Sequence, residues 1–116
     1  MEDLLNLPLD ERQVAVKKLM DKNADKVPVI FRCSSECTFA NKITVHRMFL
    51  PKANRIIDIA KSLRRQFNLT AEVSMCFSSN DVILQSTMTV QDIYEKYKSE
   101  DHILYLKIHE LSPFGC

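Results

Sequence analysis

The segment Ile103-Leu104-Tyr105-Leu106-Lys107-Ile108 decides the fold that the sequence predicts. Leucine and isoleucine alternate along one side of this segment, while Ile103 and Tyr105 make the other side apolar at one end. Branched and aromatic side chains of this kind favour a β-strand. A strand that is apolar on both sides is typical of a sheet covered on both faces. We therefore expect residues 103–108 to form a central strand.

Four other short segments have the composition of strands. They are residues 27–32, 43–50, 71–77 and 82–84. Pro28 has no amide hydrogen to donate, so the first of these strands should have a free edge or an irregular start. Pro51 should end the second strand, and the polar turn at residues 78–81 separates the last two. The sequence thus predicts a sheet of five strands.

Three segments have the apolar periodicity of amphipathic helices. Their expected N-cap residues are Asp10, Asn54 and Thr89. Gln13 and Asp92 stand three residues after the first and third of these caps, at the capping-box position. The second helix carries a regular apolar stripe that should pack in the core, formed by Ile56, Ala60, Leu63 and Phe67. The first helix is less apolar, so we expect it to cover the second face of the sheet.

The order of these elements is helix, two strands, helix, two strands, helix and strand. Such an order predicts a mixed sheet with helices against its faces, which is the α+β class. The sequence has no internal repeat and no linker, and 116 residues suffice for one domain with its own core. We therefore expect a single domain.

The charge balance excludes a protein that acts through a large basic or acidic surface. Sixteen Lys and Arg residues stand against fifteen Asp and Glu residues, for a net charge of +1. No global field therefore attracts nucleic acid or anionic lipid, and we expect no nucleic-acid partner. The start of the chain, Met1-Glu2-Asp3-Leu4-Leu5, lacks the basic and apolar parts of a signal peptide. We expect a cytoplasmic protein.

The four cysteines give no sign of a metal site or of a catalytic thiol. Cys33 and Cys37 have the only metal-like spacing, and no second pair or histidine stands at ligand spacing from them. No nucleophile motif surrounds any of the four. We expect free thiols, no metal and no cofactor.

Gly115 is the only glycine among 116 residues, whereas average composition would give about eight. So close to a chain end it can contribute little to a turn or to packing. It offers an unhindered carbonyl on a thin tail, which suits acyl transfer to a thiolate in a narrow channel. The residues alone leave a second interpretation open, in which Gly115-Cys116 is an end without function.

Five short motifs, taken together, resemble the GABARAP and microtubule-associated light-chain family of autophagy ubiquitin-like modifiers. Any one of them would be a weak signal, but they occur in the family's order over nearly the whole chain. They are Pro8-Leu9-Asp10-Glu11-Arg12, Lys26-Val27-Pro28-Val29-Ile30, Arg47-Met48-Phe49-Leu50-Pro51, Asp101-His102-Ile103-Leu104-Tyr105 and Phe114-Gly115.

The resemblance implies a ubiquitin-like β-grasp fold with additional N-terminal helices. In these terms residues 1–24 are a helical extension, residues 25–110 are the core and residues 111–116 are a conjugation tail. The resemblance further implies that a cysteine protease removes Cys116. Gly115 would then pass as a thioester through activating and conjugating enzymes to the amine of phosphatidylethanolamine. The protein would be a substrate rather than an enzyme, a cytoplasmic monomer that is recruited to autophagosomal membranes when it carries the lipid.

The resemblance also implies that the protein binds aromatic-x-x-aliphatic motifs of cargo receptors, added as a strand to the second strand of the sheet. The implied aromatic pocket consists of Leu19, Pro28, Ile30, Arg47, Phe49 and Ile103. The implied aliphatic pocket consists of Met48, Leu50, Pro51 and Ile59. Two basic residues, Lys26 and Arg65, complete the implied motif-binding set. Leu50 and Ile59 fit an interpretation as plain core residues equally well.

Several positions differ from the family pattern and indicate an altered motif preference. Asn54 and Ser62 stand where the aliphatic pocket usually has leucines. Val45 replaces a basic residue, and Ala15 replaces a glutamate near the aromatic pocket. Two other functions remain open: a sister modifier that is conjugated to a protein lysine, against which Cys116 argues, and an unconjugated β-grasp adaptor.

Overall fold

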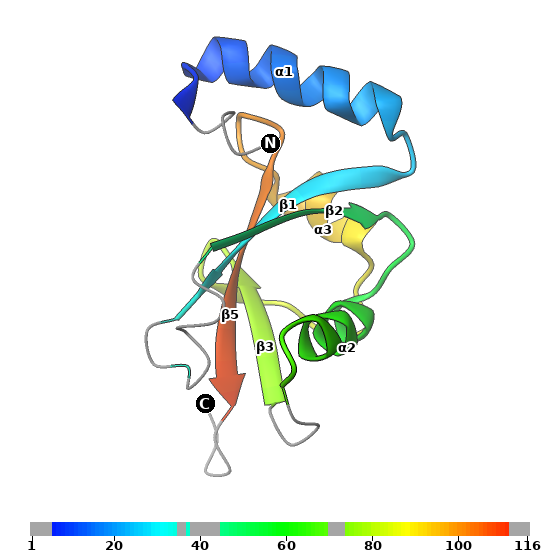
Figure 1. The fold of residues 1–116 in the computed structure, drawn as a ribbon, viewed down its shortest axis with the longest axis vertical. Coiled ribbons are helices and arrows are strands. Elements are labelled where there is room, and N and C mark those ends of the chain that lie inside the picture. The colour runs from blue at the N-terminus through cyan, green and yellow to red at the C-terminus, as the bar shows by residue number, and fades with distance from the viewer. Residues whose placement is uncertain (1–5, 35–36, 38–44, 70–73, 112–116) are drawn as a thin grey trace.

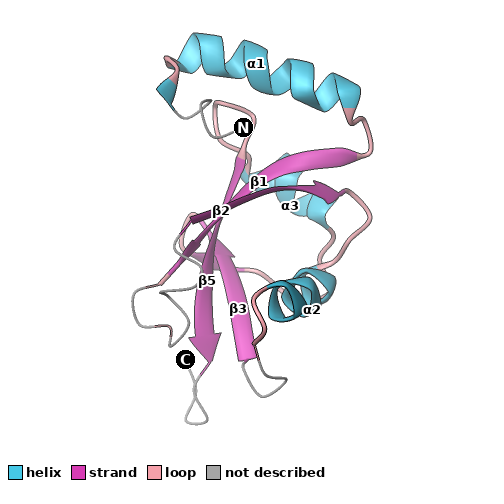
Figure 2. Cartoon of the chain, in the orientation of Figure 1, coloured by secondary structure: helices cyan, strands magenta, loops and turns pink. Residues whose placement is uncertain are grey.

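The computed structural model describes residues 6–34, 37, 45–69 and 74–111. This part of the chain contains three helices and five strands (Figure 2). In chain order they are α1 (Leu9–Lys22), β1 (Lys26–Cys33), β2 (Val45–Pro51), α2 (Ile56–Gln66), β3 (Ser74–Ser79), β4 (Val82–Ile83), α3 (Val90–Tyr97) and β5 (Leu104–Leu111).

The five strands form one mixed sheet in the order β2-β1-β5-β3-β4 (Figure 1). β5 pairs in parallel with β1 and antiparallel with β3, and β1 pairs antiparallel with β2. The last strand of the chain therefore lies in the middle of the sheet, as its two apolar sides predict. The same pairing brings the first and last strands together and closes the core.

The main core lies between one face of the sheet and the helices α2 and α3. Alternate residues of β1 point into it, and Phe31 meets Phe77 of β3 edge to face, with ring centroids 6.0 Å apart. From α2 and α3 the core takes Ile56, Ile59, Ala60, Leu63, Val90, Ile93 and Tyr94. The stripe predicted for the second helix is confirmed for Ile56, Ala60 and Leu63, while Phe67 follows the helix and packs against the core from its end.

A smaller core lies on the other face of the sheet, under α1. Val16 of α1 is fully buried against Ile30 of β1 and Ile103, with Met20 and Tyr105 packed beside them. Figure 1 shows α1 crossing one end of the sheet, near the starts of β1 and β5. α1 therefore covers one end of this second face, and the rest of the face carries no helix among the described residues.

The helix starts differ from the prediction at two of three places. Thr89 is the N-cap of α3 as expected, and its hydroxyl accepts the amide of Asp92 at 3.2 Å. Asp10 is not a cap but lies in the first turn of α1, where a carboxylate is favoured by the helix dipole. Asn54 belongs to the turn after β2, because its amide donates to the carbonyl of Pro51. Arg55 is the N-cap of α2 instead.

β5 extends three residues beyond the predicted strand. His109 pairs with Cys76, and Leu111 pairs with Ser74. The polar pair His109-Glu110 breaks the apolar pattern without ending the ladder. The sequence predicts Leu84 in a strand, but this residue follows the two-residue strand β4 and is buried in the main core. Residues 43–44 and 71–73 of the expected strands lie outside the described residues.

Candidate functional site

The residues predicted for the aromatic pocket gather on the α1 side of the sheet. In the β1/β2 ladder, Pro28 pairs with Phe49 and Ile30 pairs with Arg47, and directly paired residues share a face. Ile30 lies in the small core with Ile103. Leu19 is half-buried on α1, one turn beyond the buried Val16.

Within this group three residues form a buried floor and three form half-buried walls. Pro28, Ile30 and Ile103 are buried, whereas Arg47, Phe49 and Leu19 are only half-buried. The Nε atom of Arg47 is itself buried and has no hydrogen-bond partner among the described residues. A buried donor without a partner costs free energy, so a ligand that brings an acceptor here would be stabilised. The arrangement is an apolar floor with one available donor at its edge.

Two β2 residues predicted for the aliphatic pocket, Met48 and Leu50, lie on the opposite face of β2, whereas Pro51 pairs with Lys26 and lies on the face of Phe49. Met48 pairs with Val29 and Leu50 pairs with Val27, so both lie on the side of the main core. Leu50 is 3% exposed and Ile59 is 1% exposed, which makes both of them core residues in this structure. Met48 and Pro51 are half-buried and retain some accessible surface. Apart from Pro51, the two predicted pockets therefore lie on alternate sides of β2.

β2 is the outermost strand of the sheet on its side. Within the described residues its second edge has no strand partner, so its backbone donors and acceptors can pair with an added strand. Lys26 is half-buried at the start of β1, directly opposite Pro51. Arg65 is exposed near the end of α2.

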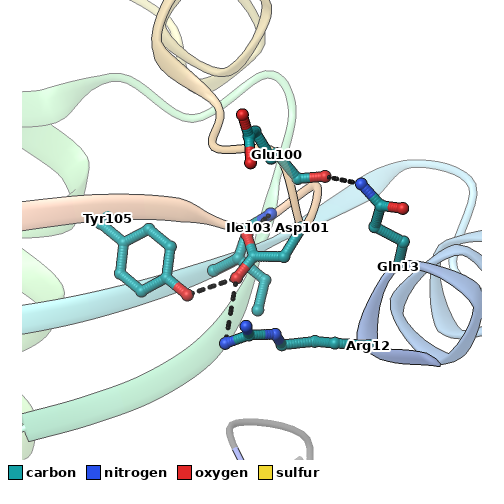
Figure 3. A network of polar contacts seen from close by, with 6 residues as sticks. All are labelled: Arg12, Gln13, Glu100, Asp101, Ile103 and Tyr105. Atoms are coloured by element: carbon teal, nitrogen blue, oxygen red, sulfur yellow. Dashed lines mark hydrogen bonds and ion pairs between the residues drawn. The ribbon is translucent and has the colours of Figure 1, made fainter. Parts of the chain in front are cut away.

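A polar network fixes α1 to the segment that precedes β5 (Figure 3). The side chain of Asp101 is only 4% exposed, and its carboxylate lies 3.6 Å from Arg12 of α1. The same carboxylate accepts the amide of Ile103 at 3.0 Å and the hydroxyl of Tyr105 at 2.5 Å. Gln13 also donates to the carbonyl of Glu100 at 2.6 Å. These contacts fix α1, which carries Leu19, to the segment that carries Ile103.

Sequence reasoning did not predict this network, although a signal for it exists. Arg12 and Asp101 occur in two of the five quoted motifs and have opposite charges.

Burial, and then the hydrogen bond to Asp101, raise the pKa of Tyr105 to about 12. Tyr105 therefore remains a hydroxyl donor to Asp101 at neutral pH.

The cysteines described in the structure are free thiols. Cys33 pairs with Ile108 in the β1/β5 ladder, and the thiol of Cys37 lies 3.6 Å from the carbonyl of Ile108. Burial, and then the neighbouring Cys37, raise the pKa of Cys33 to about 12, so it is a thiol and not a nucleophilic thiolate at neutral pH. Among the described residues, no three His, Cys, Asp or Glu side chains gather as a metal site.

The described helices are all too short or too polar to cross a membrane. Gly115 and Cys116, the predicted conjugation and cleavage positions, lie outside the described residues. The last described residue is Leu111, which is also the last residue of β5.

Comparison with known proteins decides the family. Residues 11–115 match the family described as "Autophagy protein Atg8 ubiquitin like". The chain belongs to the Atg8 family. It is similar to Autophagy-related protein 8 of Pichia angusta, with 24% identity over 93% of this chain and 86% of the relative. It is also similar to Autophagy-related protein 8 of Dictyostelium discoideum, with 26% identity over 93% of this chain and 88% of the relative.

Solved Atg8 structures show the same fold. Trypanosoma brucei ATG8 superimposes with a TM-score of 0.75 at 26% identity, over 96% of this chain and 95% of that one. Plasmodium falciparum Atg8, solved in complex with a Plasmodium falciparum Atg3 peptide, gives a TM-score of 0.73 at 19% identity, over 91% of this chain and 95% of that one. The predicted α+β ubiquitin-like fold is confirmed. The predicted family is confirmed as the Atg8 family as a whole, a family of autophagy ubiquitin-like modifiers that are not enzymes, rather than as one branch of it.

Proposed function

We propose that this Atg8-family protein is conjugated through Gly115 to phosphatidylethanolamine, after removal of Cys116. The observation that carries this proposal is the family match, whose last residue is Gly115, the chain's only glycine. A residue without a Cβ leaves its carbonyl open to a thiolate and then to an amine. Conjugation to the lipid at this position would anchor the protein to a membrane.

The steps require partners that supply the chemistry. A cysteine protease would hydrolyse the Gly115–Cys116 peptide bond and leave a carboxylate on Gly115. An activating enzyme would use ATP to form a thioester, and a conjugating enzyme would receive it by thiol exchange. The lipid amine would then attack the thioester carbonyl and release the thiolate. The Plasmodium falciparum Atg8 bound to an Atg3 peptide supports an Atg3-type enzyme as the conjugating partner.

Intact-mass spectrometry of the protein from cells tests this proposal. We expect loss of Cys116 and, when autophagy is induced, a lipid adduct on Gly115. Gly115→Ala should abolish the adduct and membrane recruitment without unfolding the protein, whereas the control Ser112→Ala should retain both. A Gly115→Ala protein that reaches membranes as the unaltered protein does would contradict the proposal.

The same protein is proposed to bind aromatic-x-x-aliphatic motifs of cargo receptors along β2. The free edge of β2 supplies backbone donors and acceptors for an extended peptide. Side chains of such a peptide point to alternate sides, as the two predicted pockets do. One side would meet the floor of Pro28, Ile30 and Ile103, and the other would meet Met48.

The structure favours the aromatic side as the stronger one. Around its buried floor, Leu19, Arg47 and Phe49 are half-buried and keep free surface. On the other side Met48 keeps free surface, but Leu50 and Ile59 have almost none. Asn54 is half-buried and Ser62 is exposed where apolar walls would otherwise stand. Burying an aliphatic anchor fully can contribute about 1.5–3 kcal/mol, and part of this contribution is lost without those walls.

Titration with a tryptophan-containing peptide measures the two contributions, because this chain has no tryptophan of its own. Replacing the aromatic residue of the peptide by alanine should weaken binding far more than replacing the aliphatic one. Asn54→Leu with Ser62→Leu should enlarge the effect of the aliphatic residue. Equal losses in the unaltered protein, or no gain in the double variant, would show that the aliphatic pocket is placed on the wrong residues.

A further inference from the structure

A hollow lies on the same face of the sheet as α1 but away from that helix. It is an open pocket of 570 Å³, and it is lined by β1, β5, β3 and the turn after β3. β5 lies between β1 and β3 in the sheet, and Figure 1 shows β5 and β3 side by side, away from the end of the sheet that α1 covers. The pocket shares no lining residue with the motif-binding set. Its polar lining includes Arg32, Ser34, Ser78, Asp81 and Lys107.

Three of these residues form one row across the sheet. Arg32 of β1 pairs with Lys107 of β5, and Lys107 pairs with Ser78 of β3. Because directly paired residues of neighbouring strands share a face, all three side chains lie on the same side. A guanidinium, an ammonium and a hydroxyl therefore stand next to one another at the pocket.

Within the part of the chain that the structure describes, the two cations of the row have no counterion in contact. Arg32 and Lys107 are both exposed, and within the described residues neither makes an ion pair or a side-chain hydrogen bond. Like charges directly opposite each other on neighbouring strands destabilise a sheet. Among the described lining residues Asp81 is the one acidic residue, and it forms no ion pair with either cation. An anion held between Arg32 and Lys107 would remove their repulsion.

Ser78 can add a neutral donor to such an anion. Its Oγ lies 2.9 Å from Nε2 of His109, the residue two places after Lys107 in β5. When His109 is the donor in this contact, the hydroxyl proton of Ser78 is free for another acceptor. The guanidinium of Arg32, the ammonium of Lys107 and the hydroxyl of Ser78 can then all donate hydrogen bonds to one ligand.

We propose that the row of Arg32, Lys107 and Ser78 binds a phosphate group. A tetrahedral oxyanion has enough acceptors for all three donors, and charge-assisted hydrogen bonds to guanidinium and ammonium groups are strong. An extended nucleic acid fits less well, because it would need a larger basic surface and free stacking aromatics. Tyr105, the aromatic residue of the lining, is held by Asp101. The phosphate can belong to inorganic phosphate or to a phospholipid headgroup.

Phosphate binding by this row does not require conjugation, but conjugation to a lipid would favour a phospholipid headgroup as the source of the phosphate. Lys107 stands eight residues before Gly115, so even a fully extended tail would keep the pocket within about 30 Å of an attached lipid. Attachment would raise the effective concentration of headgroups at the pocket.

The unconjugated protein, full length, tests the proposal in two arms. The first is a titration with sodium phosphate against sodium chloride at equal ionic strength, followed by amide NMR shifts. The second is flotation with phosphatidylcholine vesicles that contain or lack phosphatidic acid. The test variant is Arg32→Gln with Lys107→Gln. The control is Arg55→Gln with Lys17→Gln, which removes the same two charges at exposed positions elsewhere.

We expect saturable shifts at Arg32, Lys107 and Ser78 in phosphate, and roughly tenfold weaker binding in the test variant but not in the control. Binding of phosphate without flotation assigns the pocket to a soluble phosphate. Flotation that depends on phosphatidic acid and on the Arg32–Lys107 pair assigns it to a headgroup. Responses that are the same in the unaltered protein and the test variant in both arms would overturn the proposal.

Discussion

At the residue scale, Asp101 is the side chain on which the site depends most. It is almost fully buried, yet it carries a carboxylate that three groups from two elements use together. The three groups are Arg12 of α1, the amide of Ile103 just before β5 and the hydroxyl of Tyr105 in β5, so the residue joins the helix to the central strand (Figure 3). Ile103, in the floor of the aromatic side, is one of its hydrogen-bond donors. Stability and binding should therefore change together when Asp101 is replaced.

Asp101→Ala should lower the free energy of unfolding by about 3 kcal/mol, because it leaves the Tyr105 hydroxyl, the Ile103 amide and Arg12 without their buried acceptor. Urea denaturation measures this loss. The control Asp21→Ala removes an exposed carboxylate of α1 and should change stability by less than about 0.5 kcal/mol. Equal effects of the two changes would mean that the network contributes no net stability.

Two tyrosines should make the protein sensitive to high pH. Burial raises the pKa of Tyr94, and burial with the Asp101 hydrogen bond raises that of Tyr105, to about 12 from 10.0. Between these values the unfolded chain has released protons that the folded chain retains, so the free energy of unfolding falls as pH rises. Below pH 10 the contribution is fully present.

Urea denaturation at a series of alkaline pH values checks this expectation. The double variant Tyr94→Phe with Tyr105→Phe should be less stable at neutral pH, because the carbonyl of His102 and the carboxylate of Asp101 each lose a donor. Its stability should nevertheless decline less steeply above pH 10. An unchanged steepness would assign the alkaline sensitivity to other groups.

At the element scale, the helix starts show where local sequence suffices and where it does not. Thr89 has the hydroxyl side chain and the position of an N-cap, and Asp92 follows three residues later. In the structure Thr89 is the N-cap of α3. Asn54 has an equally suitable side chain, but tertiary contacts assign its backbone to a turn, in which its carbonyl accepts the amide of Val90 at 2.7 Å. The residues next to Asn54 in the sequence do not indicate its contact with Val90, which is distant in sequence.

Thr89→Ala should destabilise the protein by about 1 kcal/mol, since the amide of Asp92 loses its acceptor at the first turn of α3. Thermal denaturation followed by circular dichroism measures the effect. Thr87→Ala is a matched control, because Thr87 is exposed and lies outside any helix or strand. A control that loses as much stability as Thr89→Ala would show that the cap is not the cause.

At the scale of the whole molecule, the sequence predicts the class, the central strand and the face of the aromatic side. Alternation alone places Pro28 with Ile30 and Arg47 with Phe49, and the ladder confirms both pairs on one face. The burial of Leu50 and Ile59 could not be decided in this way, because core and pocket residues have the same apolar character. The row of Arg32, Lys107 and Ser78 was also missed, since it depends on the register of three strands that are distant in sequence.

The most direct test of the central claim is a reconstituted conjugation reaction read by intact mass. The purified protein is incubated with the processing protease, the activating and conjugating enzymes, ATP and liposomes that contain phosphatidylethanolamine. We expect the protein to lose Cys116 and to gain the mass of the lipid on Gly115, and Gly115→Ala to remain unmodified. The central claim would be contradicted by a protein that stays unmodified while another Atg8 protein is lipidated in the same reaction, or by equal lipidation of Gly115→Ala.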